Sequence, residues 1–183
     1  MPLADITGLS NNIKSILNNP PVFSDPITGQ VSDVMTKNTI ADAWVDAVAG
    51  WLSTTTVPPF VATLGGPVLA KQALKAVMLP IVISNMVPVP GVNNFLIGFN
   101  SALAAAVLNV IIPGSSLAGL AVNTNILTFS TVDSIINAAI ATNTSPDNSA
   151  LSNAYAADFL KWTIPAGASF TVPATPPVIS PWA

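Results

Sequence analysis

Residues 40–52 read IADAWVDAVAGWL and contain the clearest helical pattern in the chain. Apolar side chains recur at every third or fourth position, which is the period of one face of an α-helix. This face comprises Ile40, Ala43, Trp44, Ala47, Val48, Trp51 and Leu52. Asp42 and Asp46 lie one turn apart on another face. The segment therefore predicts an amphipathic helix that begins at a cap on Asn38 or Thr39 and ends before Pro58.

Similar patterns predict further helices on both sides. One short helix runs over residues 9–17, and another from Gly66–Pro67 to just before Pro80, because proline is tolerated in the first turn but breaks a helix interior. A third covers about residues 93–112. Near the C-terminus, Ser130 is expected to cap a helix, and Ser145 to cap the next one with Pro146 as its first residue.

These segments predict a mainly α fold, a compact bundle of about five or six short helices with extended, proline-rich N- and C-terminal arms. The expected division is an N-terminal arm over 1–37, a helical domain over 38–164 and an extended tail over 165–183. Short strands are an alternative at 126–129 and 170–172. We expect the tail to lie along a neighbour or along its own domain, since it is too apolar for a free linker.

The charged residues exclude several classes of function. All eight acidic residues are Asp and all five basic residues are Lys, with no His or Cys in the 183 residues. Proton transfer at neutral pH leans on His, and soft metal sites need Cys or His. Five scattered Lys under a net charge of −3 give no basic footprint for nucleic acid. We therefore expect no cofactor, no metal and no nucleic-acid partner.

Candidate catalytic groups are few. Asp42 and Asp46 are interpreted as the polar face of a helix, and they match the spacing of Lys71 and Lys75, so two helices are able to pair through a short charge ladder. Asp5-Ile6-Thr7-Gly8 differs from the Asp-Thr-Gly signature of aspartic proteases by one inserted residue, and that chemistry needs two such carboxylates. No catalytic residue is assigned, and the chain is expected not to be an enzyme.

Residues 76–132 contain no charge, in a chain that is only 7% charged. Such a segment either faces a membrane, as in a pore or lysis protein, or forms core and subunit interface. Its four prolines and several asparagines divide it into pieces that are mostly shorter than a membrane span, which favours the interface. Residues 95–112 are the candidate for a single spanning helix under the membrane alternative. The N-terminus lacks the basic region and long apolar run of a signal peptide.

Aromatic residues are the candidate interface anchors, because large aromatic side chains dominate the energetics of cores and interfaces. The candidates are Trp44, Trp51, Tyr155, Phe159, Trp162, Phe170 and Trp182. Tyr155, Phe159 and Trp162 share a predicted helical stripe with Leu151. The expected partners are further copies of this chain and other structural subunits.

Three stretches resemble small virion structural proteins of tailed bacteriophages: MPLADITGLSNNIKSILNN at the N-terminus, DAWVDAVAGWLSTTTVPP in the middle and TVPATPPVISPWA at the C-terminus. This resemblance implies a neck, tail, baseplate or capsid-associated subunit, present in many copies and assembled in the host cytoplasm. It assigns no role to any single residue.

Overall fold

The computed structural model of the protein describes residues 5–54, 71–86, 93–108, 120–123, 126–163, 168–172 and 178–181. Six helices lie within these residues, which confirms the mainly α class. Their bounds are α1 Thr7–Asn18, α2 Asp33–Leu52, α4 Lys71–Asn85, α5 Asn94–Leu108, α6 Ser130–Ala141 and α7 Asn148–Thr163.

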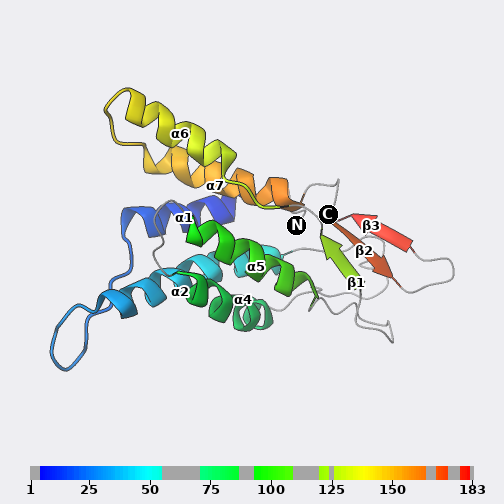
Figure 1. The fold of residues 1–183 in the computed structure, drawn as a ribbon, viewed down its shortest axis with the longest axis horizontal. Coiled ribbons are helices and arrows are strands. Elements are labelled where there is room, and N and C mark those ends of the chain that lie inside the picture. Colours follow the sequence, from blue (N-terminus) through cyan, green and yellow to red (C-terminus); the bar gives the residue numbers. More distant parts are fainter. Residues whose placement is uncertain are drawn as a thin grey trace.

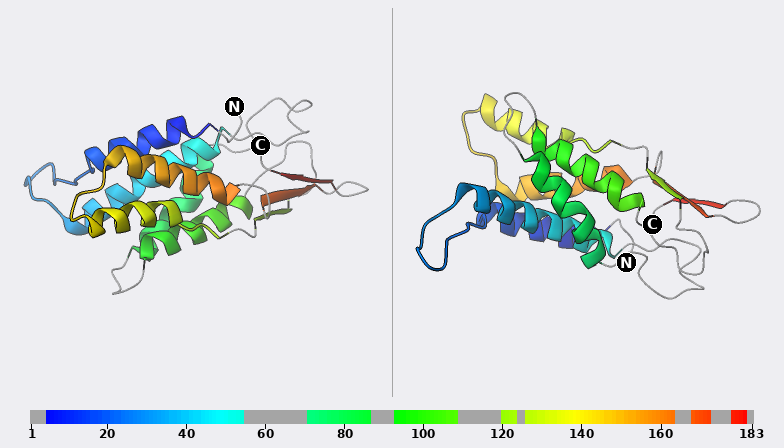
Figure 2. Two further views of the ribbon diagram at one scale, coloured as in Figure 1. Left: turned by 90° about the horizontal axis from the view of Figure 1, so that it is seen from above. Right: turned by 60° about the horizontal axis from the view of Figure 1, so that its bottom comes forward.

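The helices pack as a series of neighbours that closes on itself (Figures 1 and 2). α6 packs on α7, α7 on α1, α1 on α2, α2 on α4, and α4 on α5. The series closes because Phe99 of α5 meets Phe159 of α7 edge-on, with ring centroids 5.5 Å apart. The N-terminal helix α1 thus belongs to the bundle, and its Leu9 and Ile13 are fully buried.

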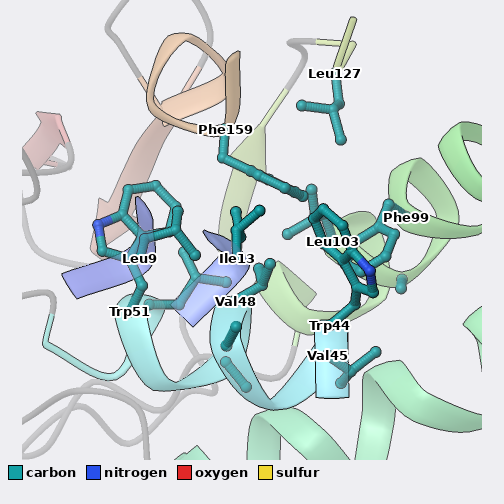
Figure 3. Packing of buried hydrophobic residues seen from close by; sticks show 14 of the residues in the cluster. Leu9, Ile13, Trp44, Val45, Val48, Trp51, Phe99, Leu103, Leu127 and Phe159 are labelled. Atoms are coloured by element: carbon teal, nitrogen blue, oxygen red, sulfur yellow. The ribbon is translucent and has the colours of Figure 1, made fainter. Parts of the chain in front are cut away.

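The core lies between α1, α2, α5 and α7 (Figure 3). Val48 of α2 is completely buried, as the pattern over residues 40–52 predicts, and so is Val45, which lies outside the predicted face. A set of mostly edge-to-face aromatic contacts then links Trp44, Phe95, Phe129, Tyr155 and Phe159, with centroids 5.0–6.0 Å apart. Such contacts add to the stabilisation from area burial alone.

The start of α2 differs from the prediction. The helix begins at Asp33, not after Asn38 or Thr39, and Ser32 caps it by accepting a hydrogen bond from the Met35 amide. Thr39 instead donates from Oγ1 to the Met35 carbonyl inside the helix. The apolar period weakens over residues 33–39, so the sequence pattern showed only the part of the helix that is packed against the core.

Pro80 lies inside α4, so the predicted helix end before it is wrong. The ring removes one backbone donor, but Met78 and Val82 on either side are fully buried, and this tertiary packing outweighs the local cost. The expected start at Gly66–Pro67 lies outside the described residues. Helix α5 begins as predicted, with Asn93 Oδ1 accepting from the Leu96 amide.

No helix among the described residues is long and apolar enough to cross a membrane.

The N-termini of α6 and α7 are capped by Asp residues instead of the predicted serines. Ser130 is the first residue of α6 and its side chain caps nothing. Asp158 of α7, 1% exposed, accepts hydrogen bonds from the amides of Thr131 and Val132, at 2.9 and 3.2 Å. Asp147 precedes α7 and accepts from the Ala150 amide. The cap of α6 therefore comes from a neighbouring helix that packs against it, whereas the cap of α7 comes from the residue that precedes it.

A three-stranded antiparallel sheet lies at one end of the bundle (Figure 1), in the order β1 Leu120–Asn123, β2 Ala168–Val172 and β3 Val178–Pro181. The expected strand at 170–172 is therefore confirmed, and through β2 the tail pairs with its own chain. The alternative strand at 126–129 is wrong. There the Asn100 side chain bonds both the N–H and the carbonyl of Leu127, at 2.7 and 3.0 Å, which fixes the segment to α5.

The predicted charge ladder between α2 and α4 is confirmed. Lys75 lies 2.9 Å from the Asp42 carboxylate and 3.3 Å from that of Asp46, and Lys71 lies 2.7 Å from Asp46. The hydrogen bond from Lys71, followed by that from Lys75, lowers the pKa of Asp46. Asp42 and Asp46 therefore connect α2 to α4.

Candidate interaction surface

Apolar side chains outside the core gather on one projecting segment, the connection between α1 and α2 together with the first turn of α2. Of the eight large apolar side chains that are exposed in the described residues, five belong to residues 22–35, which we call the apolar loop. They are Val22, Ile27, Val31, Val34 and Met35, with Ile27 93% exposed at the tip. The loop extends beyond the ends of both helices, away from the bundle (Figure 2). Exposed apolar side chains that lie near one another on a surface are candidates for an interaction site.

The apolar loop is held by its own hydrogen bonds. The Asp25 amide donates to the Gln30 carbonyl at 2.9 Å, and the Gly29 amide donates back to the Asp25 carbonyl at 2.8 Å. At its base, the Phe23 amide donates to Thr36 Oγ1 on α2. Gly29 adopts a φ of 69°, a conformation that glycine takes without steric cost.

Asp25 organises the tip through its side chain. Its Oδ1 accepts hydrogen bonds from the amides of Ile27 and Thr28, at 2.7 and 3.1 Å. These two bonds lower the pKa of Asp25, so the carboxylate is charged and in place at neutral pH. Pro26 between them fixes its own φ. The tip therefore presents Ile27 in a preorganised form, which reduces the entropic cost of binding.

A shallow hollow on the bundle, which we call the aromatic groove, is a second surface feature. Its volume is about 250 Å³, and it lies over the aromatic cluster. The lining residues are Ile40, Trp44, Asn93, Phe95, Phe129 and Tyr155. None of these side chains is charged, so the groove suits an uncharged occupant. The Asn93 amide, the Tyr155 hydroxyl and the Trp44 indole N–H are the polar groups of these side chains.

Tyr155 connects the groove with the nearest charge. Burial raises the pKa of its phenol, and the negative charge of Asp133 raises that pKa further. Tyr155 is thus a neutral hydrogen-bonding group at any physiological pH, and Asp133 in the first turn of α6 places a negative charge near the groove.

The predicted interface residues lie mostly in the core. Trp44, Trp51, Phe159 and Trp162 are between 0% and 6% exposed. The indole N–H of Trp51 is buried and has no hydrogen-bond partner among the described residues. Tyr155 is half-buried and lines the groove. Phe170 lies in β2, paired with Ala121 of β1, and Trp182 lies outside the described residues. A contact of these residues with a partner stays a prediction.

Asp5 and Asp25 are each followed by a Thr-Gly pair, and each belongs to a separate local turn. Asp5 precedes α1 and accepts a hydrogen bond from the Thr7 amide at 3.0 Å, which lowers its pKa. Asp25 follows the same helix and binds its own loop. They do not share a proton as an aspartic-protease pair does.

The sequence does not predict the apolar loop as a surface, because its apolar residues follow neither a helical nor a strand period. Asp25-Pro26 and Thr28-Gly29 are typical of turns, but only the exposure of Ile27 and its neighbours distinguishes a surface turn from a buried one.

Comparison with protein-family models, with curated proteins and with solved structures found no match to this chain.

Proposed function

We propose that this chain is a structural subunit of a large homo- or hetero-oligomeric particle, and not a catalyst, with the apolar loop as its principal contact. The single observation behind the proposal is the concentration of exposed apolar side chains on a preorganised, projecting loop. A rigid apolar projection is unfavourable in water unless another surface covers it.

The kind of particle follows from the resemblance of three stretches to virion proteins of tailed bacteriophages. On that basis we propose a capsid-associated, neck, tail or baseplate subunit, assembled in the host cytoplasm. The composition supports an assembly role, because a chain that is 7% charged has little charged surface with which to remain a free monomer.

The test is size-exclusion chromatography with light scattering on the full chain, with and without mild detergent. We expect species well above the monomer mass of 18.7 kDa in plain buffer. Ile27→Asp should weaken association about 10- to 100-fold, since full burial of such a side chain is worth about 1.5–3 kcal/mol. The matched control is Ile140→Asp, at a 69% exposed position on α6, and it should assemble normally.

Two results would overturn the proposal. One is a wild-type chain that stays monomeric at every concentration. The other is recovery of the chain only in detergent, together with binding to lipid vesicles that Ile27→Asp abolishes, which would make the apolar loop a membrane contact.

A further inference from the structure

We infer that the apolar loop of one copy docks into the aromatic groove of a second copy of the same chain. This inference rests on the proposed function and deepens it by naming the partner of the loop. It joins two surface features of the described residues, a projecting apolar tip and an uncharged hollow lined by aromatic, aliphatic and polar side chains.

The groove suits an aliphatic side chain in size and chemistry. An apolar cavity of about 150 Å³ accommodates a molecule as large as benzene, and the groove has a volume of about 250 Å³. Ile27 is the most exposed large apolar side chain in the described residues. Against Phe95 and Tyr155 it would gain the burial that it lacks in the single chain.

One pair of charges that flank the two features is complementary, although the loop itself also carries Asp25 and Asp33. Lys37 is exposed on α2, one turn beyond Val34 of the apolar loop. Asp133 lies close enough to Tyr155 to raise its pKa. Within the described part of the chain, neither Lys37 nor Asp133 forms an ion pair. Docking the loop of one copy on the groove of the next brings these opposite charges to the same interface.

We take the contact to be head-to-tail, each loop docking on the groove of the next copy, because a reciprocal two-fold pair would cover both surfaces and end assembly at a dimer. The apolar loop extends away from the helices that carry the groove (Figure 2), so its tip does not fill the groove of its own chain. Each docked pair leaves one free loop and one free groove. Such an interface adds further copies until a ring closes or a filament grows, which is the behaviour expected of a particle subunit.

A mixing experiment tests this geometry with two variants of the full chain. Ile27→Asp disables the loop, and Ile40→Glu disables the groove by placing a carboxylate at a half-buried position. Each variant alone should be monomeric by light scattering. An equimolar mixture should contain a species of twice the monomer mass, because one intact groove meets one intact loop. Thermal melts of both variants check that they fold.

The outcomes separate the inference from the proposed function. If Ile40→Glu assembles like the wild type while Ile27→Asp is monomeric, the loop has another acceptor and the inference is wrong. The same holds if both variants are monomeric and the mixture forms no dimer. If Ile27→Asp itself assembles like the wild type, the proposed function fails.

A charge exchange keeps the inference testable if Ile40→Glu does not fold. Lys37→Asp should weaken association a few-fold, up to about fivefold, as expected for an exposed ion pair. Asp133→Lys in the same chain should restore it, since every copy then carries the reversed pair. Equal effects of the single and double variants would overturn the docking mode.

Discussion

The capping of α6 from a distance gives the sharpest prediction for stability. Asp158 is completely buried in α7, and its carboxylate accepts from the amides of Thr131 and Val132. Each such hydrogen bond to a charged acceptor is worth about 1.5–3 kcal/mol, and an ordinary local cap about 0.5–2 kcal/mol. The ion pair with Lys161, whose side chain is 56% exposed, adds little. We expect Asp158→Ala to lower the free energy of unfolding by about 3 kcal/mol.

Urea denaturation followed by circular dichroism measures this loss. The control is Ser130→Ala, which removes the cap that the local sequence predicts, and it should change stability by less than about 0.5 kcal/mol because the Ser130 side chain caps nothing. Asp158→Asn should lie between the two, since the amide retains one acceptor. A large effect of Ser130→Ala with a small effect of Asp158→Ala would refute the capping of α6 by α7.

Three further predictions concern α2, α4, α5 and the apolar loop. Lys75→Met should lower the free energy of unfolding by up to about 1 kcal/mol, and Lys71→Met by less, because Lys75 forms two ion pairs and is the less exposed of the two. Urea denaturation measures both losses, and the difference between them should vanish in about 1 M NaCl. Gly98→Ala should destabilise the protein by about 1–3 kcal/mol, because the new Cβ would lie only 3.1 Å from Asn85 Cβ. Gly50→Ala should instead stabilise α2 by about 0.5 kcal/mol, because its Cβ would lie 3.6 Å from the Lys71 side chain, an ordinary contact. The pKa of Asp25 is lowered in the folded chain, so the apolar loop should be fully ordered above about pH 4 and lose this order as the pH falls through the pKa of the folded state. Hydrogen exchange of the Ile27 amide measures the order of the loop, and Asp25→Asn should abolish its pH dependence.

The sequence predicts the parts of the fold in which one local pattern decides. The apolar period over residues 40–52 identified the core face of α2, and matched spacing of Asp and Lys identified its pairing with α4. Predictions failed where a distant residue decides. Asp158 caps α6 from 26 and 27 positions along the chain, and Asn100 fixes Leu127 in a non-strand conformation.

The candidate site was less predictable than the fold. Sequence reasoning looked for interface anchors among the aromatic residues, but four of the seven are used in the chain's own core. The exposed residues are aliphatic, and the sequence alone does not show whether an Ile or Val in a turn is buried or exposed. Tyr155 is the exception, because it is both an aromatic candidate and part of the groove.

Cysteine cross-linking tests loop-to-groove assembly most directly, and the chain contains no native cysteine to interfere. Ile27→Cys and Ile40→Cys proteins are mixed under mild oxidation, with Ile140→Cys replacing either partner as the control. A disulfide forms readily only when the two Cβ atoms come within about 4.5 Å. The account predicts that the 27–40 disulfide forms faster than any other pair. A preference for 27–27 linkage, or 27–40 linkage no faster than 27–140, would contradict it.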